Sequence, residues 1–141
     1  MKEFTLVIDA NILVSAYSSA GRIQEKWRAG LGSHRFVISP EIFAEVERTL
    51  RQTEFHLGPD EIKECLKDIL KRCTLVRPKA RFNGNIADEK DRHLANLALE
   101  VGADKILTGE TALKKGITIA GASVMSFAEF VSQESRAARK P

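Results

Sequence analysis

The chain has 141 residues, of which 43% are hydrophobic and 29% charged; this composition is typical of one globular domain and excludes a mostly disordered chain. The net charge of +3 is only weak evidence for a nucleic-acid partner. The longest run without a charged residue, 116–128, is shorter than the ~20 residues of a membrane span. Two cysteines are too few for a disulfide framework or a zinc site, so we expect a cytoplasmic protein with reduced thiols.

Short apolar runs alternate with segments of helical periodicity. Ser39 and Pro40 are typical of a helix start, and Gly102 is typical of a helix end. In chain order we predict strand 5–8, helix 11–17, a helical piece around Trp27, strand 35–38, helix 40–51, a helix from residue 59, strand 74–76, helix 88–101, strands 105–108 and 123–125, and a final helix after Ser126.

This alternation predicts an α/β fold, a single-domain α/β/α sandwich around a central, mostly parallel five-stranded sheet. We expect the domain to cover residues 1–133. The remaining residues, 134–141, include Arg136, Arg139 and Lys140 and are predicted to form a basic, flexible tail.

Acidic residues follow two of the predicted strands. Asp9 comes directly after strand 5–8, and Glu110 comes shortly after strand 105–108. Because ligands of such sheets bind at the carboxyl ends of the strands, both acids should lie on the functional edge. Asp88 and Asp91 begin the helix that precedes strand 105–108, and Asp91 lies on its apolar face. An acid in that position is costly unless it is paired or binds a metal.

The helix of residues 40–51 carries a further acid, but helical periodicity does not identify it. Glu45 and Glu47 lie about equally close to the apolar stripe, and Glu41 lies farther from it. Each acid has an ordinary alternative role, such as a helix cap or a loop residue. Several carboxylates at one edge nevertheless repel one another unless a hard cation such as Mg²⁺ or Mn²⁺ lies between them. Such a site suits a phosphodiester substrate.

Four sequence blocks carry a resemblance to a known family. They read VIDANIL (7–13), ISPE (38–41) followed by Glu45, DEKD (88–91) followed by GAD (102–104), and ILTGE (106–110). In this order and at these separations the chain resembles the PIN-domain family, in particular the VapC-like toxin components of toxin–antitoxin systems. The resemblance extends over about residues 5–131.

The resemblance implies a ribonuclease that depends on Mg²⁺ or Mn²⁺ and cleaves single-stranded RNA. By position it implies that Asp9, Asp91 and Glu110 bind the metal and that Glu45, rather than Glu47, is a further catalytic acid. The accessory residues would be Asn11, Asp88 and Thr108, and the candidate contacts to the RNA backbone are Lys114, Lys115 and Arg92. It also implies an antitoxin protein that covers the acidic site, and a homodimer.

Two departures from the family pattern leave an alternative function open. Glu110 stands where the family usually has an aspartate, and Ala112 stands where many relatives carry a second acid. The alternative is a catalytically weak or inactive PIN-fold module that binds RNA or a partner protein. Phosphatase and nucleotide-binding motifs are absent from the sequence. The histidines lack ligand spacing and are predicted at the surface: His34, His56 and His93.

Overall fold

The computed structural model describes residues 3–18, 25–27, 34–109 and 116–139. The strand β1 (Thr5–Ile8) lies inside the sheet. It pairs in parallel with β2 (Arg35–Ile38) on one side and with β4 (Lys105–Leu107) on the other. Beyond these lie β3 (Cys73–Leu75) and β6 (Ala122–Met125), again parallel. The prediction of a mostly parallel sheet is therefore confirmed.

The described residues form six strands rather than the five predicted, in the order β3-β2-β1-β4-β6-β5. The additional strand, β5 (Thr118–Ile119), is antiparallel to β6. Ala120 and Gly121 connect them, both with positive φ, which is the backbone twist that favours a two-residue hairpin. A strand of two residues is too short to produce a periodic pattern, and the sequence analysis missed it for that reason.

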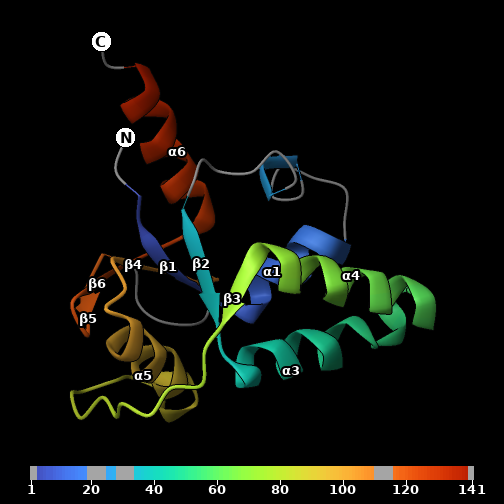
Figure 1. The fold of residues 1–141 in the computed structure, drawn as a ribbon, viewed down its shortest axis with the longest axis horizontal. Helices are drawn as coiled ribbons and strands as arrows, with labels where there is room; N and C mark the ends of the chain where they lie inside the picture. The colour runs from blue at the N-terminus through green and yellow to red at the C-terminus, as the bar shows by residue number, and fades with distance from the viewer. Residues whose placement is uncertain (1–2, 19–24, 28–33, 110–115, 140–141) are drawn as a thin grey trace.

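Helices cover the sheet on both sides (Figure 1). The helices α1 (Ala10–Ser18), α3 (Pro40–Leu50) and α4 (Pro59–Arg72) lie on one side, and α5 (Arg92–Val101) lies on the other. Short 3-10 turns, η1 (Thr53–Phe55) and η2 (Glu89–Asp91), precede α4 and α5. This arrangement is the predicted α/β/α sandwich.

The sequence signals for helix ends act largely as predicted. Ser39 Oγ accepts a hydrogen bond from the Ile42 N–H at 3.1 Å and caps α3. Gly102 ends α5 with a φ of 61°, which favours glycine. Asp88 Oδ1 accepts from the Lys90 N–H at 3.0 Å and therefore opens the 3-10 turn η2. The predicted helix 88–101 is thus a 3-10 turn followed by an α-helix.

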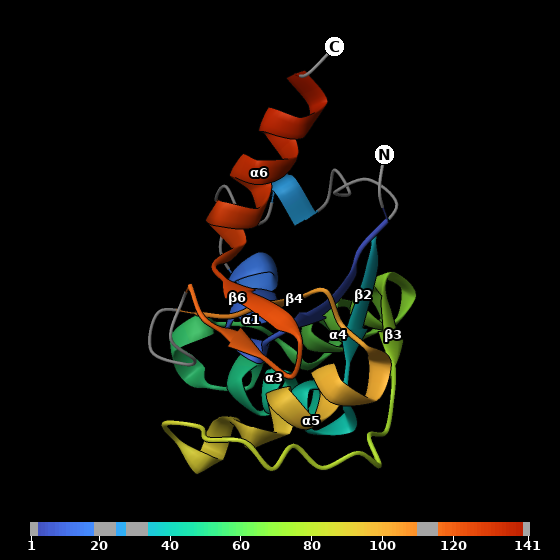
Figure 2. The same ribbon diagram turned by 90° about the vertical axis from the view of Figure 1, so that its left-hand side faces the viewer.

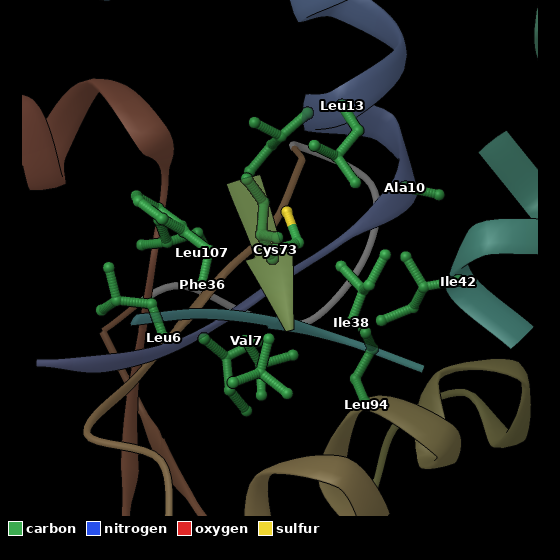
Figure 3. Packing of buried hydrophobic residues seen from close by; sticks show 14 of the residues in the cluster. Leu6, Val7, Ala10, Leu13, Phe36, Ile38, Ile42, Cys73, Leu94 and Leu107 are labelled. Carbon is green, nitrogen blue, oxygen red and sulfur yellow. The ribbon is translucent and has the colours of Figure 1, made fainter. Parts of the chain in front are cut away.

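The core lies where β1 meets helices from both sides. Leu6, Val7 and Ile8 are fully buried, as expected for a strand covered on both faces. Figure 3 shows Leu13 of α1 and Leu94 of α5 packed on opposite sides of the central strands. Because β1 is packed on both faces, the position of Asp9, the residue directly after it, is fixed as well.

The C-terminal helix α6 (Phe127–Arg139) extends away from the sheet in Figure 2. The predicted tail boundary after Gln133 falls within this helix. The alanine and arginine residues that follow are good helix formers, so they continue α6 rather than end it. Glu134, which lies beyond the predicted boundary, contacts the rest of the fold: its carboxylate lies 3.0 Å from His34 Nε2.

His34 is not the surface residue that the sequence analysis predicted. Its side chain is only 5% exposed and stacks on Phe4, with Phe130 edge-on at 5.4 Å between ring centroids. The Phe4 N–H donates to Nδ1 at 3.0 Å, and Nε2 pairs with Glu134. Both ring nitrogens have partners, which allows the imidazole to be buried.

The cysteines are buried or half-buried, as expected of structural thiols. Cys73 lies in the core, and burial raises its pKa to about 12. Within the described ranges, none of the helices combines the length and the apolar character needed to cross a membrane.

Candidate active site

The strand order reverses direction at β1, which creates a site for ligands. The chain runs from β1 outward to β2 and β3, then returns to place β4 on the opposite side of β1. In α/β sheets, ligands bind at such a point, beyond the carboxyl ends of the strands. Ile8 is in register with Leu107, so Asp9 and Thr108 emerge next to each other at this point.

The Asp9 carboxylate is held in one orientation. Its Oδ1 accepts a hydrogen bond from the Ala10 N–H at 2.7 Å, at the start of α1. Its Oδ2 accepts from Thr108 Oγ1 at 3.1 Å. Asp9 is 8% exposed and Thr108 is 1% exposed, so water competes little for these contacts. The N-terminus of α1 also favours a negative charge here.

A cavity of about 540 Å³ opens beside Asp9. It is lined from three parts of the chain: the start of α1, one side of α3, and the region of η2 with the first turn of α5. The charged and polar lining residues are Asp9, Asn11, Glu41, Glu45, Arg48, Asp88, Lys90, Asp91 and His93. The fold thus gathers five carboxylates around one cavity, against the two cations Arg48 and Lys90.

The carboxylates lie close enough to affect one another. The pKa of Asp91 is raised from its usual value, chiefly by partial burial and then by the negative charges of Asp88 and Asp9. His93 and Lys90 act in the opposite direction but do not outweigh these effects. The cavity is therefore a place where a bound cation would relieve repulsion.

The structure distinguishes Glu45 from Glu47, which periodicity could not. Glu45 lines the cavity, where Arg48 Nε and Nη2 donate to its Oε2 and Oε1 at 3.1 and 2.5 Å. Glu47 is not among the lining residues and instead accepts from Arg51 Nη2 at 2.7 Å. The position implied by the family resemblance is thus the one at the cavity.

Glu41 also lines the cavity, and the sequence analysis did not select it. Glu41 was not selected because it lies farther from the apolar stripe of α3 than Glu45 and Glu47 do. A usable signal was its spacing of four residues from Glu45, because side chains four apart share a helix face.

Asn11 and Gly109 approach each other closely at the cavity edge. Asn11 lines the cavity from the first turn of α1. A Cβ on Gly109 would lie 3.3 Å from the Asn11 side chain, which is a tight contact. The absence of a side chain at position 109 therefore lets the segment after β4 pass next to Asn11.

His93 lines the cavity too, so its prediction as a simple surface residue is wrong. Its Nδ1 is buried and has no hydrogen-bond partner within the described part of the chain. A regular helix would turn residues two positions apart by about 200° from each other. Helical periodicity therefore gave no signal that Asp91 and His93 line one cavity.

The remaining candidate residues lie elsewhere or are not described. Glu110, Lys114 and Lys115 lie outside the described residues, as does Ala112. Arg92 does not line the cavity; its guanidinium donates to Glu89 and to backbone carbonyls.

The donor set suits a hard divalent cation, although the described residues alone do not complete a site. Asp9 and Asp91 offer oxygen ligands of the kind that Mg²⁺ and Mn²⁺ prefer. Among the residues with described positions, no three acidic, histidine or cysteine side chains are grouped closely enough to hold a metal. The predicted third ligand, Glu110, lies outside the described residues.

The comparison with known proteins agrees with this geometry. The chain matches the PIN-domain family over residues 5–112, a range that contains all four sequence blocks and the cavity lining. A search of curated proteins found no match. PIN domains are generally nucleases and typically use divalent metal ions. Since the match covers most of the sequence, the chain belongs to the PIN-domain family.

Proposed function

We propose that this protein is a divalent-metal-dependent endoribonuclease that cleaves single-stranded RNA. The observation that carries the proposal is that Asp9 and Asp91 line one cavity, where partial burial and then the negative charges of Asp88 and Asp9 raise the pKa of Asp91. Acids that repel one another at a strand-order reversal favour a cation and an anionic substrate.

Asp9, Asp91 and Glu110 would hold Mg²⁺ or Mn²⁺. A divalent ion bound there supplies positive charge that lowers the pKa of an attacking water and neutralises the phosphate. Thr108 and the Ala10 N–H keep the Asp9 oxygens aimed in a fixed direction.

Glu45 would accept the proton of the attacking water. Its place in the cavity lining, where Arg48 donates to its carboxylate, supports this role. In the proposed reaction the water oxygen attacks phosphorus in line. The bond from phosphorus to the 3′ oxygen breaks, which leaves a 5′-phosphate and a 3′-hydroxyl. The proton lost by the water passes to Glu45, and the departing 3′ oxygen takes a proton from solvent.

The first experiment measures cleavage of a labelled single-stranded RNA with Mn²⁺, Mg²⁺ or EDTA. The wild type is expected to cleave with metal only, and Asp9→Asn and Asp91→Asn are expected to lose at least about 100-fold in rate. Asp60→Asn, the same change at an exposed position in the first turn of α4, is the control and should keep wild-type activity. Full activity in Asp9→Asn would refute the proposal.

A second pair of variants tests the role of Glu45. Glu45→Gln and Glu47→Gln change neighbouring glutamates of one helix, each paired with an arginine. Of these two, Glu45 lines the cavity and Glu47 does not. We expect cleavage to fall about 100-fold or more in Glu45→Gln and to stay within about twofold in Glu47→Gln. Equal losses would contradict the assignment.

The toxin role rests on the family resemblance. We propose that the protein acts in the cytoplasm, forms a homodimer, and pairs with an antitoxin that covers the acidic cavity. Expression without such a partner should arrest growth, and Asp9→Asn should abolish the arrest. RNA binding without cleavage in any divalent metal would instead favour the non-catalytic binding module.

A further inference from the structure

A basic segment joins β3 to η2. It contains Arg77, Lys79 and Arg81, and no acidic residue occurs from position 76 to 87. All three side chains are exposed. None forms an ion pair within 4.0 Å with another described residue, in contrast to Arg48, which pairs with Glu45. We call residues 77–84 the basic strap.

The middle and the end of α5 fix the first part of the strap backbone. Glu100 Oε1 accepts hydrogen bonds from the N–H groups of Lys79 and Ala80, at 2.6 and 2.8 Å. These two donors hold the pKa of the Glu100 carboxyl below its usual value. Asn96 Oδ1 accepts from the Phe82 N–H at 2.7 Å.

The start of α5 fixes the second part. Arg92 Nη1 donates to the carbonyls of Phe82 and Gly84, at 2.7 and 3.0 Å. Arg92, Asn96 and Glu100 are four residues apart, so they lie along one face of α5. Gly84 packs against the Phe82 ring, and a Cβ at this position would lie 2.3 Å from a ring carbon. The strap is therefore ordered by side chains that bind its backbone, while its own cations remain exposed.

The strap leads to the cavity. It begins after β3 and passes along α5 to η2, as the trace in Figures 1 and 2 shows. Its anchors follow the same direction, from Glu100 near the end of α5 to Arg92 at its start. Directly beyond the strap, Asp88 and Lys90 line the cavity.

We propose that the basic strap binds the sugar–phosphate backbone of single-stranded RNA and guides it into the acidic cavity. This inference takes its substrate class from the proposed function. Exposed cations neutralise phosphates and release condensed counterions. A backbone held in place before binding loses less conformational entropy than a flexible one, which increases affinity. The strap also supplies positive charge next to a cavity whose acids alone would repel RNA.

The test measures binding of a fluorescent single-stranded RNA of about 12 nucleotides by anisotropy, in EDTA, at several salt concentrations. The variant Arg77→Gln/Lys79→Gln/Arg81→Gln removes three phosphate contacts. The slope of log K against log salt should fall by about 2, and affinity near 0.15 M salt should fall roughly 50-fold. The control Lys63→Gln/Lys67→Gln/Lys71→Gln removes the same charge from α4 and should change affinity less than about threefold.

Glu100→Ala tests whether RNA binding depends on the ordered backbone of the strap or only on its positive charge. This variant makes the protein more positive by one charge but removes the acceptor of two strap N–H groups. The proposal predicts weaker RNA binding, by about threefold to tenfold. Glu64→Ala on α4 adds the same charge without touching the strap and should bind RNA as tightly as the wild type or slightly more tightly.

Tighter binding by Glu100→Ala, equal losses in the two triple variants, or no RNA binding by a folded wild type would each overturn the proposal. Circular dichroism verifies that each variant is folded. Because binding is measured in EDTA, its outcome is separate from that of the nuclease assay. A wild type that binds through the strap but does not cleave would refute the proposed nuclease and leave the strap assignment standing.

Discussion

Thr108→Val tests whether the hydrogen bond to Asp9 holds the site in its working geometry. Valine has nearly the shape of threonine, so the substitution removes the hydroxyl and leaves the packing of a residue that is 1% exposed. The lost contact is Thr108 Oγ1 to Asp9 Oδ2, at 3.1 Å. Asp9 then keeps the hydrogen bond that its Oδ1 accepts from the Ala10 N–H.

The size of the effect follows from the burial of both partners. A hydrogen bond to a charged group contributes about 1.5–3 kcal/mol, and Asp9 is 8% exposed, so water replaces the hydroxyl poorly. We therefore expect the free energy of unfolding to fall by about 2 kcal/mol. Loss of a residue that orients a metal ligand typically costs about 10–100-fold in metal affinity or activity.

Thr108→Ser is the matched control, because it keeps the hydroxyl and loses one buried methyl group. It should cost about 1 kcal/mol of stability and only a few-fold in cleavage. Urea unfolding in EDTA gives the stability of the two variants, and initial rates of RNA cleavage against Mn²⁺ concentration give activity and metal affinity. Equal cleavage by the valine and serine variants would refute the positioning role of Thr108.

Two further predictions concern stability. Tyr17→Phe removes a hydroxyl that donates to Asp68 Oδ2 at 2.5 Å and accepts from the buried Trp27 Nε1–H at 2.6 Å. We expect the free energy of unfolding, measured in urea, to fall by about 2–3 kcal/mol while RNA cleavage is retained. A loss below about 0.5 kcal/mol would contradict this expectation. Asp91→Asn should stabilise the metal-free protein at pH 7.5. Because the folded-state pKa of Asp91 is raised, deprotonation costs folded stability above that pKa, and the gain should shrink as pH falls toward the usual value of 3.8. A gain that grew on acidification, in unfolding curves measured in EDTA, would show that the sign is wrong.

The sequence was sufficient for features that depend on neighbours along the chain. The buried strand of residues 5–8, the Ser39 cap and the Gly102 helix end are local patterns, and the structure confirms each of them. The family was also predictable, since its four blocks depend on residue order and separation. The position of Asp9 directly after strand 5–8 likewise predicts that it lies at the carboxyl edge of the sheet.

Contacts across the fold were beyond the reach of local patterns. Glu45 and Glu47 are equivalent on a helical wheel, and only the packing of α3 beside α1 and η2 brings one of them to the cavity. His34 appeared to be a surface residue because its partners, Phe4 and Glu134, are distant in sequence. The strand β5 is two residues long and exists because β6 provides its hydrogen-bond partners.

The basic strap shows most clearly which features follow from local sequence and which depend on the tertiary structure. The sequence alone determined that three cations occur in a stretch without acids, which by itself describes any solvated loop. The tertiary structure decided that the loop is ordered, because Glu100, Asn96 and Arg92 bind its backbone from a helix up to 21 residues away in the chain. Side-chain pattern follows from local sequence, whereas the partners of backbone N–H and C=O groups in a loop depend on which distant residues the fold brings next to them.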